Sequence, residues 1–309
     1  FVVCSSLTSI NVASGNTHYS SIDGVLYNYV QDTLIQCPGA KTSVTILTGV
    51  TSIGWAAFGG CSGLTSITIP TGVTSIGDYA FAYCSGLISV TIPNSVTFIG
   101  EGAFGSCSSL TSITIPTGVT SIGDGAFSGC RGLTSVTIPN SVTSIENSTF
   151  RGCTSLTSVT IPNNVTSIGS SAFGGCSGLT SVTIPNSVTS IGEEAFEGCS
   201  SLTTLNFNAI NCQDFEAYYN DDYPFSGTSL TTVNIGDSVQ RIPAYFVIGC
   251  RGLTSVTIPT GVTSIGASAF YGCSGLTSVS IPNSVTSIGE SAFSGCSGLK
   301  SETIPNSVT

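Results

Sequence analysis

The sequence predicts a β-rich repeat solenoid built from short strands, and two observations support this fold class. First, the unit that runs from Gly63 to Ser85 begins again at Gly86 and recurs almost to the C-terminus. A fixed period of this kind indicates stacked repeats that share one continuous core. Second, only 7% of the 309 residues are charged and much of the chain is Ser, Thr and Gly. Such a composition favours strands over long helices.

The leucine that opens each unit defines the number of repeats, which we call rungs. We count thirteen rungs, evenly spaced except for two longer intervals, which precede Lys41 and Leu230. Lys41 stands in the leucine position of the second rung. The positions are Leu7, Lys41, Leu64, Leu87, Leu110, Leu133, Leu156, Leu179, Leu202, Leu230, Leu253, Leu276 and Leu299.

Within a rung, apolar and hydroxyl residues alternate over residues 64–69, which predicts a short strand with one face outward. Pro70 ends that strand because it has no N–H to donate. A second short strand is expected over residues 73–76, and Gly77 turns the chain. Residues 78–84 then fit one helical or 3₁₀ turn. The predicted inward set is Leu64, Ile67, Ile69, Val73, Ile76, Ala80, Phe81 and Cys84.

Ten of the thirteen cysteines repeat with the rungs, so each occupies the same core position of its rung. Neighbouring copies would stack about 4.8 Å apart with parallel side chains, which is poor geometry for a disulfide. We therefore expect buried free thiols that pack as small hydrophobic groups. Cys4 starts the same series, whereas Cys37 and Cys212 fall outside it and are the candidates for reactive or paired thiols.

The repeated pattern Leu-x-x-Ile/Val-x-Ile-Pro-x-x-Val-x-x-Ile-Gly-x-x-Ala-Phe-x-x-Cys resembles the BspA-like class of leucine-rich repeats. The resemblance covers nearly the whole chain in many near-identical copies. It implies a right-handed, curved leucine-rich-repeat solenoid whose first strands line the concave face. It also implies a secreted or cell-surface protein that is used for adhesion to host matrix or to other cells.

Residues 1–309 are thus expected to form a single solenoid with two insertions. Residues 19–38 are predicted to form a two-stranded hairpin in the first rung, and the resemblance supports it because members of the class often carry such a hairpin. The second insertion, residues 206–227, is rich in acidic and aromatic side chains. The chain begins and stops within a rung, which raises the alternative of a structural segment that self-associates end to end into a filament.

Composition and motifs exclude several function classes. The formal net charge is −10 and the six basic residues are scattered, so no nucleic-acid footprint is present. No apolar run is long enough to span a bilayer. The only histidine, His18, is expected to be a polar hairpin residue, and no nucleophile–base pair, phosphate loop or metal-ligand spacing occurs. We therefore expect no enzymatic activity and no cofactor or metal.

Two sets of residues are candidates for binding a partner. The 206–227 insertion concentrates aromatic types that anchor interfaces, next to carboxylates that form a solvated loop or, alternatively, a calcium site. The outward hydroxyl rows of the first strands form either an ordinary wet β-face or an adhesive, glycan-binding or ice-ordering face. The candidate loop residues are Phe215, Tyr218, Tyr219, Asp221, Asp222 and Tyr223; the strand-face residues are Ser66, Thr68, Ser89, Thr91, Ser112 and Thr114.

Copies of the unit differ from one another mainly after Gly77 and before Cys84, at the outer edge of each rung. Examples are Asp78-Tyr79, Ala82-Tyr83, Glu101-Gly102 and Asp124-Gly125. We interpret this variation as drift on an unconstrained surface. The sequence as a whole favours a non-enzymatic, extracellular or cell-surface protein that binds a protein or glycan on a host or neighbouring cell.

Overall fold

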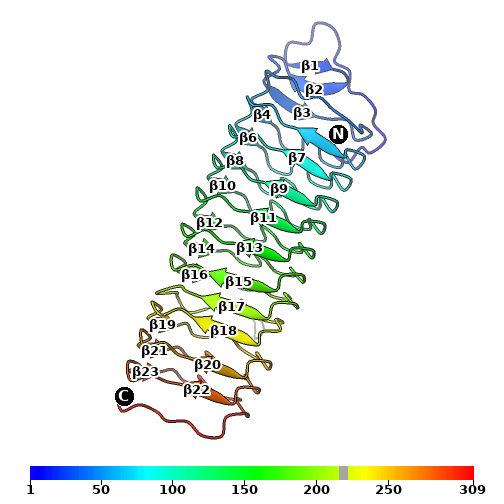
Figure 1. The fold of residues 1–309 in the computed structure, drawn as a ribbon. Coiled ribbons are helices and arrows are strands. Elements are labelled where there is room, and N and C mark those ends of the chain that lie inside the picture. Colours follow the sequence, from blue (N-terminus) through cyan, green and yellow to red (C-terminus); the bar gives the residue numbers. More distant parts are fainter. Residues whose placement is uncertain (216–221) are drawn as a thin grey trace. The chain divides into compact units, whose positions relative to one another are not determined.

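The computed structural model describes residues 1–215 and 222–309, and the chain divides into two compact units, Phe1–Leu156 and Thr157–Thr309. Each unit is a stack of short parallel strands in which every rung lies on the previous one (Figure 1). The predicted repeat solenoid is therefore confirmed. The rungs also repeat at the spacing that the sequence shows, since Ser52 pairs with Ser75 and Ser112 with Ser135.

In unit 1, equivalent residues of successive rungs pair with each other. Ser66 pairs with Ser89 and Thr68 with Thr91, so each side chain lies above its own copy. The first strands are β5 (Ser66–Thr68), β7 (Ser89–Thr91), β9 (Ser112–Thr114) and β11 (Ser135–Thr137). The second strands are β4 (Ser52–Ile53), β6 (Ser75–Ile76), β8 (Phe98–Ile99), β10 (Ser121–Ile122) and β12 (Ser144–Ile145).

Unit 2 repeats the same two ladders of strands. The first strands are β13 (Ser158–Thr160), β15 (Ser181–Ile184), β17 (Thr204–Phe207), β18 (Thr232–Ile235), β20 (Ser255–Thr257) and β22 (Ser278–Ser280). The second strands are β14 (Ser167–Ile168), β16 (Ser190–Ile191), β19 (Arg241–Ile242), β21 (Ser264–Ile265) and β23 (Ser287–Ile288). The pairing of β17 with β18 bridges the second insertion, since Thr204 stands opposite Thr232.

The core lies between the two ladders and the turns. All eight residues of the predicted inward set in the Leu64 rung are at most 4% exposed. The repeated phenylalanines stack face to face along unit 1. The ring centroids of Phe104 and Phe127 are 5.5 Å apart, as are those of Phe127 and Phe150, and both pairs are nearly parallel. Parallel offset rings add to the stabilisation that burial alone provides.

The expected helical turn is instead a run of β-turns. The N–H groups of Ala80 and Ala82 close turns onto the carbonyls three residues earlier, at 3.2 and 2.9 Å. In alternation with them, the N–H groups of Tyr79 and Phe81 donate to the next rung, each at 2.7 Å. An α-helix would direct its N–H groups to carbonyls four residues earlier, and a 3₁₀ helix would close its three-residue bonds at consecutive residues, whereas here such bonds alternate with bonds to the next rung. The φ of Tyr79, +56°, also marks the third position of a type II turn, which a helix does not allow.

Strands form in fewer rungs than the thirteen that we counted. Within the described residues, ten of the thirteen leading positions are followed by a first strand, and the second ladder has eleven members when β3 is included. The rungs of Leu7, Lys41 and Leu299 are described in full and lack a first strand. Lys41 reaches the carbonyl of Asp23 with its ammonium group instead of entering the core. In the last of these rungs Glu302 stands where the previous rung has the inward Val279. The N–H of Val279 donates to the Glu302 carboxylate and not to a backbone carbonyl of the last rung.

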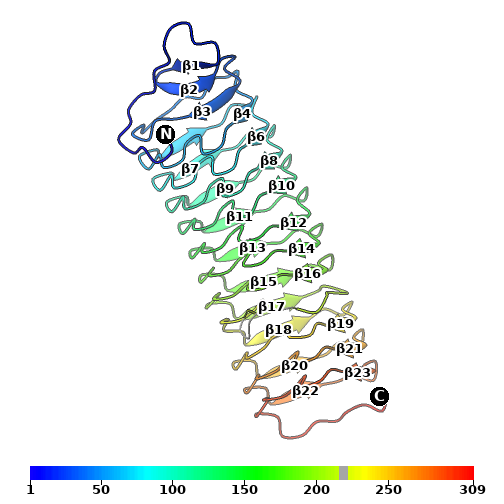
Figure 2. The same ribbon diagram turned by 180° about the vertical axis from the view of Figure 1, so that it is seen from behind.

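The first insertion is a three-stranded antiparallel sheet, not the predicted two-stranded hairpin. It consists of β1 (Tyr19–Ile22), β2 (Val25–Asn28) and β3 (Thr33–Gln36), and β3 joins the second ladder through β4. Asp23 and Gly24 both have positive φ and form the tight turn between β1 and β2. Figure 2 shows this sheet at the N-terminal end of unit 1.

The predicted thiol series is confirmed in part. No disulfide joins any of the thirteen cysteines, which all lie within the described residues, and all but Cys4 are buried. A hydrogen bond recurs along most of the series: the thiol donates to a phenylalanine carbonyl of the previous rung, as Cys84 does to Phe58 at 3.1 Å. Cys4 is exposed and lies outside the series. Cys37 is buried beside Cys61, but its thiol donates to the carbonyl of Pro38 and does not make the bond of the series.

Replacing Phe127 with alanine should test the ring stack. The side chain is fully buried and stacks on a ring at either side, so the substitution removes both contacts. We expect a loss of about 3–5 kcal/mol in the free energy of unfolding, measured by urea denaturation. Tyr271→Ala is the control because Tyr271 is 48% exposed, and it should change stability little. A Phe127 variant as stable as that control would contradict the role of the stack.

Thiol labelling should test the burial of the cysteines. Burial raises the pKa of Cys130, Cys212 and Cys273 to about 12. At pH 8 roughly one such thiol in ten thousand is ionised, and thiolates are the reactive species. We expect iodoacetamide to modify only Cys4 in the folded protein and all thirteen in denaturant, as read by intact mass. Labelling of Cys37 or Cys212 as fast as that of Cys4 would show that the described packing is wrong; Cys4→Ser identifies the fast site.

Candidate binding surfaces

The predicted strand-face residues form two regular rows on the first strands of unit 1. All six hydroxyl side chains are exposed, while the residue between them in each strand faces the core. Within the part of the chain that the structure describes, no side-chain hydrogen bond engages Ser66, Thr68 or their copies on β7 and β9. Their hydroxyl groups are therefore presented to solvent at the rung spacing of about 4.8 Å.

A second row of threonines has a structural role instead. Thr74, Thr97 and Thr120 each precede a second strand, and their hydroxyls donate to the carbonyl of the previous rung at 3.4 Å. The N–H of Thr74 donates to the same carbonyl at 2.9 Å. The hydroxyls of this row are thus already engaged by the backbone, whereas those of the strand face make no such hydrogen bond within the described residues and are available to a partner.

The second insertion contributes to the core as well as to the surface. Phe215 is 1% exposed and packs between Phe225 and Phe246, with centroid separations of 6.3 and 6.4 Å. Its ring is therefore not presented to a partner, and the prediction that Phe215 contacts one is wrong. Tyr223 is half-buried and stacks on Tyr245 at 5.1 Å. Asp222 lies beside it and accepts the N–H of Glu194 with its carbonyl.

Three of the predicted loop residues, Tyr218, Tyr219 and Asp221, lie outside the described residues. What the structure does show is how the insertion is anchored. The carboxylate of Asp214 pairs with the guanidinium of Arg241 and accepts the N–H of Ala244 at 2.6 Å. Burial raises the pKa of Asp214, but the Ala244 hydrogen bond and the Arg241 charge outweigh it and lower this pKa below its usual value.

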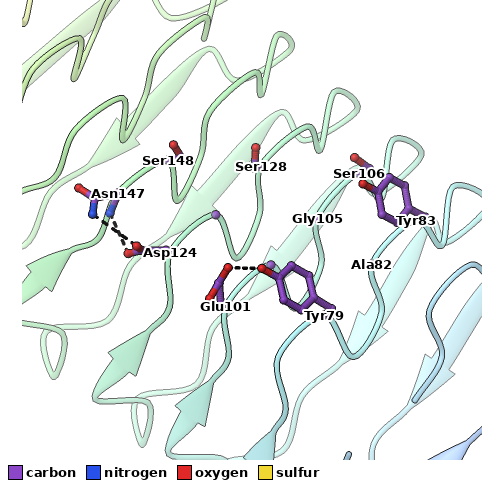
Figure 3. A pocket seen from close by; sticks show the side chains of 12 residues that line it. Tyr79, Ala82, Tyr83, Glu101, Gly105, Ser106, Asp124, Ser128, Asn147 and Ser148 are labelled. Carbon is purple, nitrogen blue, oxygen red and sulfur yellow. Dashed lines mark hydrogen bonds between the residues drawn. The ribbon is translucent and has the colours of Figure 1, made fainter. Parts of the chain in front are cut away.

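The outer turns of unit 1 form a groove that the sequence did not predict as a site (Figure 3). It is a hollow of about 320 Å³ that crosses four successive rungs. We call it the outer-turn groove. It is lined by Tyr79, Ala82, Tyr83, Glu101, Gly102, Gly105, Ser106, Asp124, Gly125, Ser128, Asn147 and Ser148.

Hydrogen bonds between neighbouring rungs orient the carboxylates of the groove. The carboxylate of Glu101 accepts a hydrogen bond from the phenol hydroxyl of Tyr79, as Figure 3 shows. Asp124 accepts the backbone N–H and the side-chain amide of Asn147, at 3.2 and 3.4 Å. The bond to Glu101, together with weaker effects of burial and nearby acidic groups, raises the pKa of Tyr79. The phenol therefore remains protonated at neutral pH.

The groove exists because equivalent positions in adjacent rungs carry side chains of different size. Tyr79 is followed one rung later by Gly102, and its ring lies against that glycine, since a Cβ there would come within 2.5 Å of the ring. Gly125 follows Gly102 in the next rung. We predicted that this variation is drift on an unconstrained surface. No single substitution makes a site; the hollow arises because the differing side chains are stacked on four neighbouring rungs.

The described residues show no grouping suited to metal or membrane. No three His, Cys, Asp or Glu side chains within residues 1–215 and 222–309 are arranged to hold a metal ion. None of the described segments forms a helix long and apolar enough to cross a membrane. His18 is exposed, and its ring nitrogen lies 3.1 Å from the hydroxyl of Thr17.

Comparison with known proteins identifies relatives. Residues 35–157, 143–221 and 219–309 match a family described as BspA type leucine rich repeat region, in six copies. The chain is 30% identical to a leucine rich cell surface protein from Faecalibacterium prausnitzii A2-165, over 95% of this chain and 86% of that one, with a TM-score of 0.48. No protein among those with curated descriptions matches.

Two further solved structures are leucine-rich repeat proteins. The one from Bacteroides ovatus ATCC 8483 is 28% identical over 94% of this chain and 93% of that one, with a TM-score of 0.44. The one from Eubacterium ventriosum ATCC 27560 is 25% identical over 97% of both chains, with a TM-score of 0.47. The relationship to the family rests on the match of the chain to the family's repeat pattern and on the 30% identity to the Faecalibacterium protein.

Replacing Asp214 with alanine should loosen the second insertion. The carboxylate is about half exposed, so solvent screens the ion pair, and we expect a loss of about 1 kcal/mol at pH 7. Because the folded pKa is lowered, this stabilisation is present above the unfolded value near 3.9 and is lost as pH falls through the folded pKa.

The measurement is urea unfolding of the two proteins at several pH values. The difference between wild type and Asp214→Ala should be full at pH 7 and should shrink below about pH 4. Asp237→Ala, at an exposed position of the same unit, is the matched control. A difference that stays the same at pH 3 would show that the carboxylate charge is not what anchors the insertion.

Proposed function

Since the chain belongs to the BspA-type leucine-rich repeat family, we propose that it is a non-enzymatic, secreted or cell-surface protein that binds a protein or glycan partner through an extended solenoid surface. The observation that carries this proposal is the strand face: in-register rows of exposed hydroxyls on a fixed backbone, which no hydrogen bond from another described side chain occupies. The extracellular location is supported by the family and by the Faecalibacterium relative, whose description names it a cell surface protein.

Rigidity is the physical advantage of such a surface. The strand backbone is already hydrogen-bonded to neighbouring strands, as β5 is to β7 and β9 to β11, so a partner that docks on it does not have to order the chain. Less of the interaction energy is then spent on conformational entropy. Donor and acceptor hydroxyls repeated along the rungs suit a partner that is itself extended, such as a glycan chain or a matrix protein.

The second insertion is proposed as an additional contact for the same partner. Tyr218, Tyr219, Asp221, Asp222 and Tyr223 are its candidate residues, and tyrosine is among the residue types that dominate interface energetics. The buried Phe215 and the Asp214–Arg241 pair then serve as its anchor.

A binding screen followed by two matched variants tests the strand face. The purified chain is first applied to arrays of matrix proteins and of oligosaccharides, and its mass is measured by light scattering. Thr68→Lys with Thr114→Lys then places two charges on the strand face, on rungs separated by β7. Ser62→Lys with Ser108→Lys places the same charge on the exposed turns that immediately precede those two rungs.

We expect the strand-face pair to lower the affinity for the partner at least tenfold and the turn pair to leave it unchanged. Both pairs should unfold at nearly the same temperature as the wild type, because all four positions are exposed. Equal binding by the two pairs would refute the strand face as the binding surface. Concentration-dependent multimers with no array binding would support the structural alternative, end-to-end self-association, in its place.

A further inference from the structure

We propose that the outer-turn groove of unit 1 binds a neutral saccharide unit, an inference that rests on the proposed binding function and assigns one place and one ligand class to it. The groove lies on the turns, apart from the strand-face residues, and is made by residues that differ between rungs. It is therefore a feature of this chain and not of the repeat.

The shape of the groove suits a single ring or a short oligosaccharide. Its volume of about 320 Å³ is at the lower end of the range for small-molecule sites, about 300–1,000 Å³. Gly105 and Gly125 leave part of its floor without side chains, and Gly102 makes room for the ring of Tyr79. This floor is rigid because the turn backbone is hydrogen-bonded to the next rung. For example, the N–H of Gly102 donates to the backbone carbonyl of Asp124 at 2.8 Å.

Two tyrosines provide the apolar contact that a sugar ring needs. Tyr83 is 64% exposed and Tyr79 is 36% exposed, whereas the phenylalanine between them is fully buried. A pyranose ring has an apolar C–H face that packs on an aromatic ring, and a tyrosine offers such a ring with a polar end beside it. The ring of Tyr79 is held in place by Gly102 beneath it and Glu101 at its hydroxyl.

The polar side chains of the groove match a polyhydroxyl ligand. Glu101 and Asp124 are acceptors for ligand hydroxyls, and hydrogen bonds to a carboxylate are stronger than those to neutral acceptors. Both are pre-oriented, because Tyr79 and Asn147 already hold them. Three half-buried serines complete the lining with groups that both donate and accept: Ser106, Ser128 and Ser148.

Charge decides which saccharides fit. Among the described residues, no lysine or arginine lines the groove, so a sialic or uronic acid would face Glu101 and Asp124 without a counter-charge. A lysine or arginine side chain of a protein partner would satisfy the charge. It would, however, leave the serine hydroxyls unmatched, and both carboxylates already accept hydrogen bonds from their neighbours. A neutral saccharide uses the rings, the carboxylates and the hydroxyls together.

The test uses the whole chain on an array that contains neutral, sialylated and uronic-acid oligosaccharides, followed by calorimetric titration with the best neutral oligosaccharide. We expect neutral oligosaccharides to bind and acidic ones not to bind. Tyr83→Ala should lower the affinity at least tenfold, and Asp124→Asn should lower it several-fold. Tyr271→Ala removes another exposed outer-turn tyrosine, in unit 2, and should leave it unchanged.

Failure of this inference can be told apart from failure of the proposed function. Saccharide binding that survives Tyr83→Ala but is lost in the Thr68→Lys, Thr114→Lys pair would overturn the groove as the site and leave the binding function standing. Tyr83-dependent binding of an oligolysine peptide, lost at high salt, would overturn the saccharide assignment. Absence of binding to every oligosaccharide would overturn it too, while a bound matrix protein would still support the function.

Discussion

The structure depends on backbone hydrogen bonding from one rung to the next. These bonds run along both strands of the rung and continue through the outer turns, where Tyr79, Phe81 and Tyr83 donate to the rung that follows. Burial of one rung's apolar residues cannot offset the entropy of ordering its backbone and side chains. Stacking supplies what a single rung lacks, because it covers each layer of the core and gives each backbone donor a partner within reach.

This dependence explains which residues can change. Inward positions must keep their size because each lies between its own copies, as Phe127 does between Phe104 and Phe150. Outward positions contact little, provided that the backbone donors stay paired. The outer turns tolerate tyrosine, glutamate or glycine at equivalent places, since backbone hydrogen bonds to the next rung hold the turn whatever the side chain. A site can therefore arise on this edge without any cost to the core.

The periodicity was sufficient to predict the rung, its inward residues and the buried thiols, because each is a repeated property. It was less informative where a single residue decides the local structure. Asp23 and Gly24 turn a predicted strand into a hairpin, a signal that the sequence did contain. Glu302 removes a strand by replacing one valine. The groove could not be found from any one copy, since it depends on which unlike copies become neighbours.

A rung that lacks its cysteine shows what that position requires. Thr228 stands there, and its hydroxyl donates to the carbonyl of Phe225 at 2.8 Å. Elsewhere a thiol donates to a carbonyl of the previous rung, as Cys273 does to Val247 at 3.1 Å. A small side chain with one donor satisfies the position in both cases. The repeated cysteines are thus part of the hydrogen-bonded scaffold, and recognition belongs to the outward residues that differ from rung to rung.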